Sequence, residues 1–159
     1  MEFLTWLQGS AVSQWIAGSP SLLAYPTFLT LHTAGMSVVV GACAVMALRV
    51  LGVAPEMPLS AFRHVPRIVW GGFAVNATTG FGLFAMDAEH KATQTVFYVK
   101  LLLIALALIC YARLRRRVFA RPSAAVDAGI GREAKVLAVF SLILWTGATV
   151  AGRLMAYLI

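Results

Sequence analysis

Residues 26–48 read PTFLTLHTAGMSVVVGACAVMAL, an apolar run whose only basic side chain is His32. As a helix the run is about 34 Å long, and roughly 20 apolar residues are enough to cross the hydrocarbon core of a bilayer. The run therefore predicts a transmembrane helix, which ends where Arg49 follows.

Three more apolar runs follow, at about 66–86, 93–112 and 134–159. The chain has 159 residues, of which 60% are hydrophobic and 12% charged, and its mean hydropathy is +0.84. Soluble domains are about 45–50% apolar and about 25% charged. The sequence predicts an all-α, polytopic membrane four-helix bundle over residues 21–159, too short for an added soluble catalytic domain.

Residues 1–20 are apolar but too short for a span. Four apolar residues recur there at helical spacing: Leu4, Leu7, Ala11 and Trp15. Such a pattern predicts an amphipathic helix that lies in the membrane interface.

The net charge of +7 comes from basic residues whose positions are uneven. Ten of the thirteen Lys and Arg residues lie in or beside the connections after the first and third runs. Seven of them share the later connection: Arg113, Arg115, Arg116, Arg117, Arg121, Arg132 and Lys135. Because basic residues beside spans mark the cytoplasmic side, both termini are expected to be periplasmic in a bacterial inner membrane. The same residues can hold anionic lipid, and nucleic acid is not an expected partner.

Polar residues from several spans reach one depth. His32, Lys100 and Arg153 each lie about 9–10 Å inside the outer face, counting 1.5 Å per residue. Thr79 falls near the same level, and Asn76 lies one turn deeper. Since ionisable residues inside spans are functional candidates by default, His32, Lys100 and Arg153 are predicted to line one cavity for an anionic or redox-active ligand, with Asn76 or Thr79 on its wall. The alternatives are that Lys100 and Arg153 snorkel to headgroups and that His32 is a hydrogen-bonded core histidine.

Soft metal ligands also recur on the first span. Met36 and Cys43 follow His32 on one helical stripe, and imidazole, thioether and thiol suit Cu(I) or haem iron. His90, in the outer connection, is a further candidate ligand, and packing is the alternative for Met36 and Cys43. Hydrolytic chemistry has no support, because the sequence contains no Walker loop, HExxH motif or Ser-His-Asp set.

Several short motifs carry a family resemblance. The segments 31–35 (LHTAG), 79–84 (TGFGLF), 97–102 (FYVKLL) and 152–157 (GRLMAY) resemble an uncharacterised family of small four-span bacterial membrane proteins, over about residues 20–159. More distantly, the layout is similar to the copper-resistance D family and to the haem-containing membrane protoporphyrinogen oxidases. The latter resemblance implies that His32 is an axial haem ligand and Lys100 its partner lysine, although the tryptophan-rich run of those oxidases is missing here.

The first functional hypothesis is a membrane redox protein, a haem-dependent oxidoreductase that holds b-type haem near the outer leaflet and exchanges electrons with a quinone or a porphyrin. Lys100 and Arg153 pair with the propionates or polarise a quinone carbonyl, and Asn76 and Thr79 add hydrogen bonds. The second axial ligand stays open among Met36, Lys100 and His90.

Two other hypotheses belong to different classes. In a copper-binding or transport protein, one group of residues gathers the ion outside and another passes it inward: Met86, His90 and Met155, then His32, Met36 and Cys43. In an accessory subunit of a homo-oligomer or larger membrane complex, the polar layer only fixes the helix register.

Overall fold

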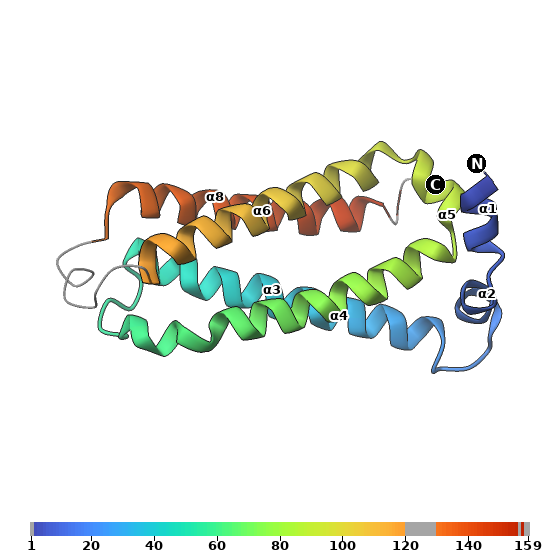
Figure 1. The fold of residues 1–159 in the computed structure, drawn as a ribbon, viewed down its shortest axis with the longest axis horizontal. Helices are drawn as coiled ribbons and strands as arrows, with labels where there is room; N and C mark the ends of the chain where they lie inside the picture. Colours follow the sequence, from blue (N-terminus) through green and yellow to red (C-terminus); the bar gives the residue numbers. More distant parts are fainter. Residues whose placement is uncertain (1, 120–129, 156, 158–159) are drawn as a thin grey trace. The chain divides into compact units, whose positions relative to one another are not determined.

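The computed structural model describes residues 2–119, 130–155 and 157, and this part of the chain is helical, without strands. It forms seven α-helices and one 3-10 helix (Figure 1). Their bounds are α1 Glu2–Gln8, α2 Ala11–Gly18, α3 Tyr25–Leu51, η1 Leu59–His64, α4 Val65–Ala85, α5 Ala88–Thr93, α6 Thr95–Phe119 and α8 Arg132–Leu154.

Four of these segments are long and apolar enough to cross a membrane: Tyr25–Leu51, Leu59–Ala85, Thr95–Val118 and Arg132–Leu154. The prediction of an all-α protein with the four helices of a membrane bundle is therefore confirmed. The third span, α6, continues to Phe119, seven residues beyond the predicted end at 112. Arginine is a good helix former, and its long side chain can reach water from a helix end. Arg121 lies outside the described residues.

The chain divides into two compact units. The first comprises Met1–Val39 and Arg67–Thr95, and the second comprises Val40–Pro66 and Val96–Ile159. The boundaries fall inside α3 and within the first residues of α4 and α6, and each unit is described by itself.

In the first unit, glycines let α3 and α4 approach closely. A Cβ at Gly35 would lie 2.9 Å from the backbone oxygen of Gly72, and one at Gly82 would lie 2.6 Å from Cε1 of Phe28. Neither position has room for a larger residue. Small residues at such positions allow the backbones of membrane helices to approach closely. Gly71 differs, since no described atom lies within 4 Å of a Cβ placed there.

The segment before α3 forms two helices where the sequence predicts one. The break falls at residues 9–10, where Ser10 caps α2 by accepting a hydrogen bond from the backbone N–H of Ser13 at 3.3 Å. Serine is a preferred N-cap, and this position starts a new helix rather than continuing α1. Of the predicted apolar face, Leu7 is buried and Trp15 is 45% exposed, and the place of this segment in the membrane interface stays a prediction.

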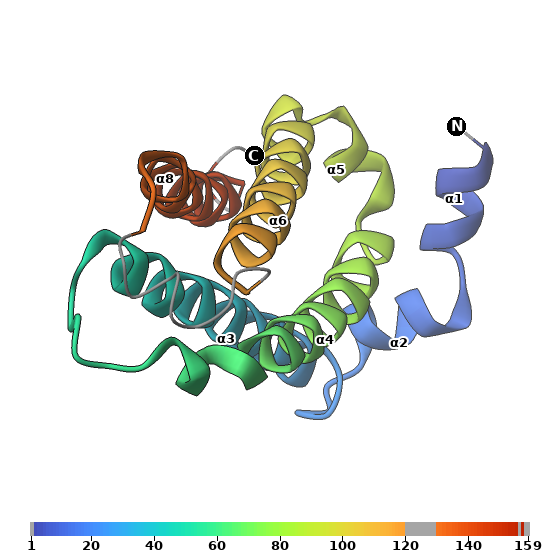
Figure 2. The same ribbon diagram turned by 60° about the vertical axis from the view of Figure 1, so that its left-hand side comes forward.

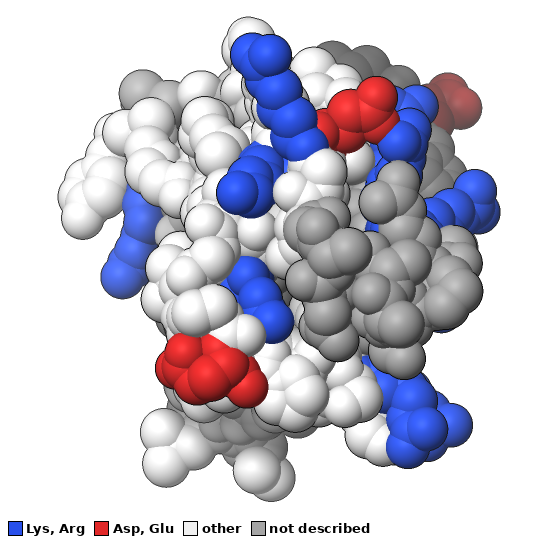
Figure 3. Space-filling model, turned by 90° about the vertical axis from the view of Figure 1, so that its left-hand side faces the viewer, with Lys and Arg blue, Asp and Glu red and all other residues white. Residues whose placement is uncertain are grey.

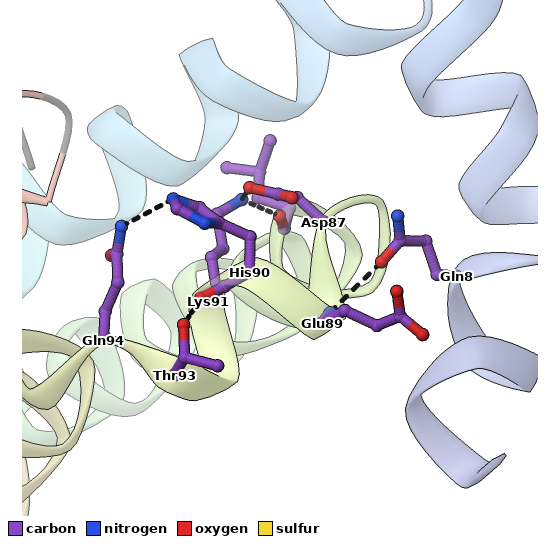
Figure 4. Close-up of polar contacts among 8 residues, drawn as sticks. Gln8, Asp87, Glu89, His90, Lys91, Thr93 and Gln94 are labelled. Carbon is purple, nitrogen blue, oxygen red and sulfur yellow. Dashed lines mark hydrogen bonds and ion pairs between the residues drawn. The ribbon is translucent and has the colours of Figure 1, made fainter. Parts of the chain in front are cut away.

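The predicted polar connection at 87–91 largely forms the short helix α5, against which α1 packs. Leu7 contacts the buried alanines Ala85 and Ala88. Glu89 links α5 to α1 by two hydrogen bonds. Its carboxylate accepts from the Thr5 hydroxyl. Its backbone N–H donates to Oε1 of Gln8 at 3.1 Å (Figure 4). The apolar face of α1 is thus shared between α5 and the exterior.

Lys91 lies half-buried on α5. Its ammonium donates to the backbone oxygen of Leu83 and lies 4.0 Å from a carboxylate oxygen of Asp87 (Figure 4). Burial lowers the pKa of Lys91, and the Asp87 carboxylate opposes that shift.

In the second unit, α6 and α8 pack side by side (Figures 1 and 2). A Cβ at Gly147 would lie 3.4 Å from Leu103, and the Cys110 thiol donates to the backbone oxygen of Leu137 at 3.0 Å. Cys43 and Cys110 are both buried, free thiols.

Candidate functional site

His32 is held against α4 through one ring nitrogen. Its Nδ1 lies 3.0 Å from the backbone oxygen of Asn76. The nearby donors have shorter bonds elsewhere: the Asn76 amide donates to the His32 carbonyl at 2.8 Å, and the Thr79 hydroxyl donates to the Val75 carbonyl at 2.6 Å. Nδ1 is therefore the donor, and in the neutral form of the ring the lone pair is on Nε2.

Asn76 and Thr79 come together at the histidine, as neighbours on one face of α4. The Asn76 amide nitrogen is 3.3 Å from Nδ1 of His32, and the Thr79 hydroxyl is 3.4 Å from the same atom. Thr79 is buried and His32 is half-buried. Counting placed Thr79 at the depth of His32 and Asn76 one turn deeper, and both side chains contact the histidine.

Gly80 supplies the space that the imidazole occupies. A Cβ at this position would lie 2.8 Å from Cε1 of His32, 3.2 Å from Nδ1 and 3.9 Å from Nε2. The ring thus presents its Nδ1–Cε1 edge to α4, and Nε2 is the nitrogen further from it. Gly80 is not among the site residues that the sequence predicts; its signal is the position of a glycine four residues after Asn76.

Lys100 and Arg153 lie in the second unit, near the start of α6 and in the last turn of α8. The Lys100 side chain is half-buried, and its Nζ would be 3.6 Å from a Cβ at Gly152. Arg153, the next residue, is exposed. Lys100 thus reaches the level of Arg153 on the neighbouring helix. That His32 lines one cavity with both cations stays a prediction.

The remaining metal candidates have separate surroundings. Met36 is half-buried on α3, one turn after His32, and Cys43 belongs to the second unit. His90 is exposed on α5, where its Nε2 is 3.0 Å from the side-chain nitrogen of Gln94 (Figure 4). Among the described residues, no three His, Cys, Asp or Glu side chains are grouped as a metal site. Met86 and Met155 lie in different units, and the copper path stays a prediction.

The fold and composition define a polytopic helical membrane protein with a polar contact between α3 and α4. Comparison with protein-family models, curated proteins and solved structures finds no match. The resemblance to small four-span bacterial membrane proteins, and more distantly to copper-resistance and haem oxidase families, remains a prediction.

Proposed function

We propose that this chain is an integral membrane redox protein that holds b-type haem through Nε2 of His32. The observation that carries the proposal is the 3.0 Å contact between Nδ1 of His32 and the Asn76 carbonyl. Histidines that bind metals characteristically donate their other ring N–H to a carbonyl or carboxylate, which fixes the tautomer and raises the basicity of the ligating nitrogen.

The donor set fits haem. An imidazole with its lone pair on Nε2 is a common protein ligand of haem iron. Asn76 orients the ring, and Gly80 leaves room for it. Bound haem would supply one-electron chemistry, exchanged in this proposal with a quinone or a porphyrin.

Lys100 and Arg153 have a defined part in the proposal. A cation kept within a span is costly unless an anion or a route to water compensates for it. The Lys100 ammonium lies against Gly152, beside Arg153. Charge-assisted hydrogen bonds to carboxylates suit such a pair, and we assign them to the haem propionates.

The proposal includes an orientation in a bacterial inner membrane. The basic end of α6 and the basic start of α8 face the cytoplasm, and both termini face the periplasm. The support is the unequal distribution of Lys and Arg between the connections. The predicted haem ligand then lies near the outer leaflet.

A second function is favoured by a different observation. His32 and Asn76 exchange hydrogen bonds in both directions beside the close approach of Gly35 to Gly72. Such an arrangement can also serve only to fix how two membrane helices pair, as an accessory subunit needs.

The visible spectrum of the purified protein separates the two functions. We expect a Soret band, and sharper bands after reduction with dithionite, in protein from haem-replete cells. His32→Ala should remove most of the bound haem, because the iron loses its protein ligand. His64→Ala, at an exposed histidine, should leave the spectrum unchanged and is the matched control. A colourless protein that also fails to take up added haemin would overturn haem binding and leave the accessory function.

A further inference from the structure

A basic hollow lies between the end of α6 and the start of α8, both in the second unit. Its volume is about 660 Å³. The residues that matter here are Arg113, Arg116, Arg117, Arg132, Glu133 and Val136. Figure 3 views this end of the molecule and shows the blue Lys and Arg side chains there.

Positive charge prevails in this basic hollow. Arg117 forms an ion pair with Glu133, the one carboxylate among the described lining residues. Four positive charges thus face one negative charge. The other three arginines, Arg113, Arg116 and Arg132, are exposed. Guanidinium groups pair in a bidentate manner with phosphates and with carboxylates, so their cluster suits such an oxyanion better than a halide.

An apolar surface adjoins the basic hollow. A second hollow of about 310 Å³ shares Arg132 and Val136 with the first and continues over Val139 and Phe140. Val139 and Phe140 are 43% and 55% exposed. The polar and apolar parts therefore follow one another along α8.

The position of the two hollows matches a membrane interface. The candidate spans end at Val118 on α6 and begin at Arg132 on α8. The four arginines therefore lie within the last two turns of α6 or at the start of α8, from where their long side chains can reach the headgroups. Val139 and Phe140 lie about two turns inside the α8 span, in the hydrocarbon layer. The charged residues thus lie toward the headgroup layer and the apolar residues toward the hydrocarbon layer, as the phosphate and the acyl chains of a phospholipid do.

We propose that this basic hollow is a binding site for one anionic phospholipid, whose phosphate pairs with Arg113, Arg116 and Arg132 and whose acyl chain lies along Val139 and Phe140. The site is independent of haem, since it uses none of the residues around His32. A lipid bound there would tie the ends of α6 and α8 together through groups that otherwise repel.

Lipid retention by the full-length protein tests the site. The purified protein is exposed to equal amounts of phosphatidylglycerol and phosphatidylcholine in detergent, and bound lipid is measured by native mass spectrometry. We expect preferential retention of phosphatidylglycerol. The double variant Arg113→Gln/Arg116→Gln should lower that retention by about tenfold or more, because each basic residue near an anionic headgroup contributes roughly fivefold.

The control is Arg63→Gln/Arg67→Gln, which removes the same charge at exposed arginines that do not line the hollow. Its retention of phosphatidylglycerol should equal that of the unmodified protein. Equal losses in both double variants would overturn the proposal, because net charge alone would then explain binding. Equal retention of the two lipids, or displacement of the lipid by millimolar inorganic phosphate or by an oligonucleotide, would overturn it as well.

A single variant covers the case in which the double variant fails to fold. Glu133→Gln removes the carboxylate that pairs with Arg117 and should raise phosphatidylglycerol retention. A fall in retention would show that the lipid does not compete with Glu133 and would count against the site.

Discussion

His32 and Asn76 are joined by two hydrogen bonds of opposite direction. The imidazole N–H of His32 donates to the Asn76 backbone carbonyl at 3.0 Å, and the Asn76 amide donates to the His32 backbone carbonyl at 2.8 Å. Each side chain thus donates a hydrogen bond to the backbone carbonyl of the other residue, in a region where lipid tails offer no hydrogen-bond partner. The pair fixes the register of α3 on α4 and the orientation of the ring by the same contacts.

Replacing Asn76 by Leu should lower the free energy of unfolding by about 1 kcal/mol, because hydrogen bonds between membrane helices average about 0.6 kcal/mol and reach about 1.7. The backbone carbonyl that accepts from His32 remains in this variant. Denaturant titration in mixed micelles, followed by circular dichroism, measures the loss. Thr78→Val, at an exposed position on the same helix, is the control and should have little effect. Equal stability of Asn76→Leu and the unmodified protein would contradict the pairing.

Lys91 should give the protein a distinct response to alkaline pH. Its folded-state pKa lies below the ordinary 10.5 because of burial, so between those two values the unfolded chain binds more protons than the folded one. Stability should therefore gain a contribution that increases with pH through this window, and Lys91→Gln should lack it. Unfolding of the two proteins at a series of pH values from neutral to 10.5 measures the difference. Parallel curves would show that burial leaves Lys91 unshifted.

Much of the fold follows from the sequence because a membrane-spanning helix needs a long run of apolar residues. The run at 26–48 could hardly be anything but a span, and the structure extends it only to Tyr25–Leu51. The break after α1 was not predicted, because Gly9 and Ser10 sit within a continuous apolar pattern, and Ser10 has to act as a cap before a new helix begins. Local capping competed there with periodicity.

The contacts at His32 were predictable only in part. Depth counting grouped Asn76 and Thr79 with the histidine, since 1.5 Å per residue is a rigid rule for helices. It could not give the ring orientation, which depends on how closely two helices approach. That approach is set by Gly72 and Gly80, whose effect appears only when the partner helix is in place.

Trp6 should lie at the headgroup level of the membrane. It is 67% exposed on α1 and stacks with Phe3, and tryptophan favours the interface. In liposomes, a variant with Trp6 as the sole tryptophan should be quenched more by lipids brominated near the headgroup than by lipids brominated deep in the chain. A second variant with Trp145 as the sole tryptophan is the comparison. Trp145 is 5% exposed, and its fluorescence should be quenched weakly by both kinds of lipid. Weak quenching of Trp6 by all lipids would place α1 away from the membrane.

The orientation of the chain is open to direct measurement. Ten of the thirteen basic residues lie in or beside the connections that we assign to the cytoplasm. Alkaline phosphatase fused after residue 120 should therefore be inactive in bacterial cells, and green fluorescent protein at the same point should fluoresce. Fusions after Thr93 should behave oppositely. An active phosphatase after residue 120 would reverse the assigned orientation.

Gly80→Ala tests the fit of the histidine ring with a single methyl group. The new Cβ would lie 2.8 Å from Cε1 of His32, closer than atoms can pack, so the ring must turn and its 3.0 Å contact with Asn76 must lengthen. We expect a stability loss of about 1–3 kcal/mol, typical of overpacking. Weaker haem retention should accompany it if His32 is the iron ligand. Gly71→Ala adds the same methyl on the same helix where no described atom lies within 4 Å, and it should be neutral or slightly stabilising. Equal stability of the two variants would mean that Gly80 does not hold the ring.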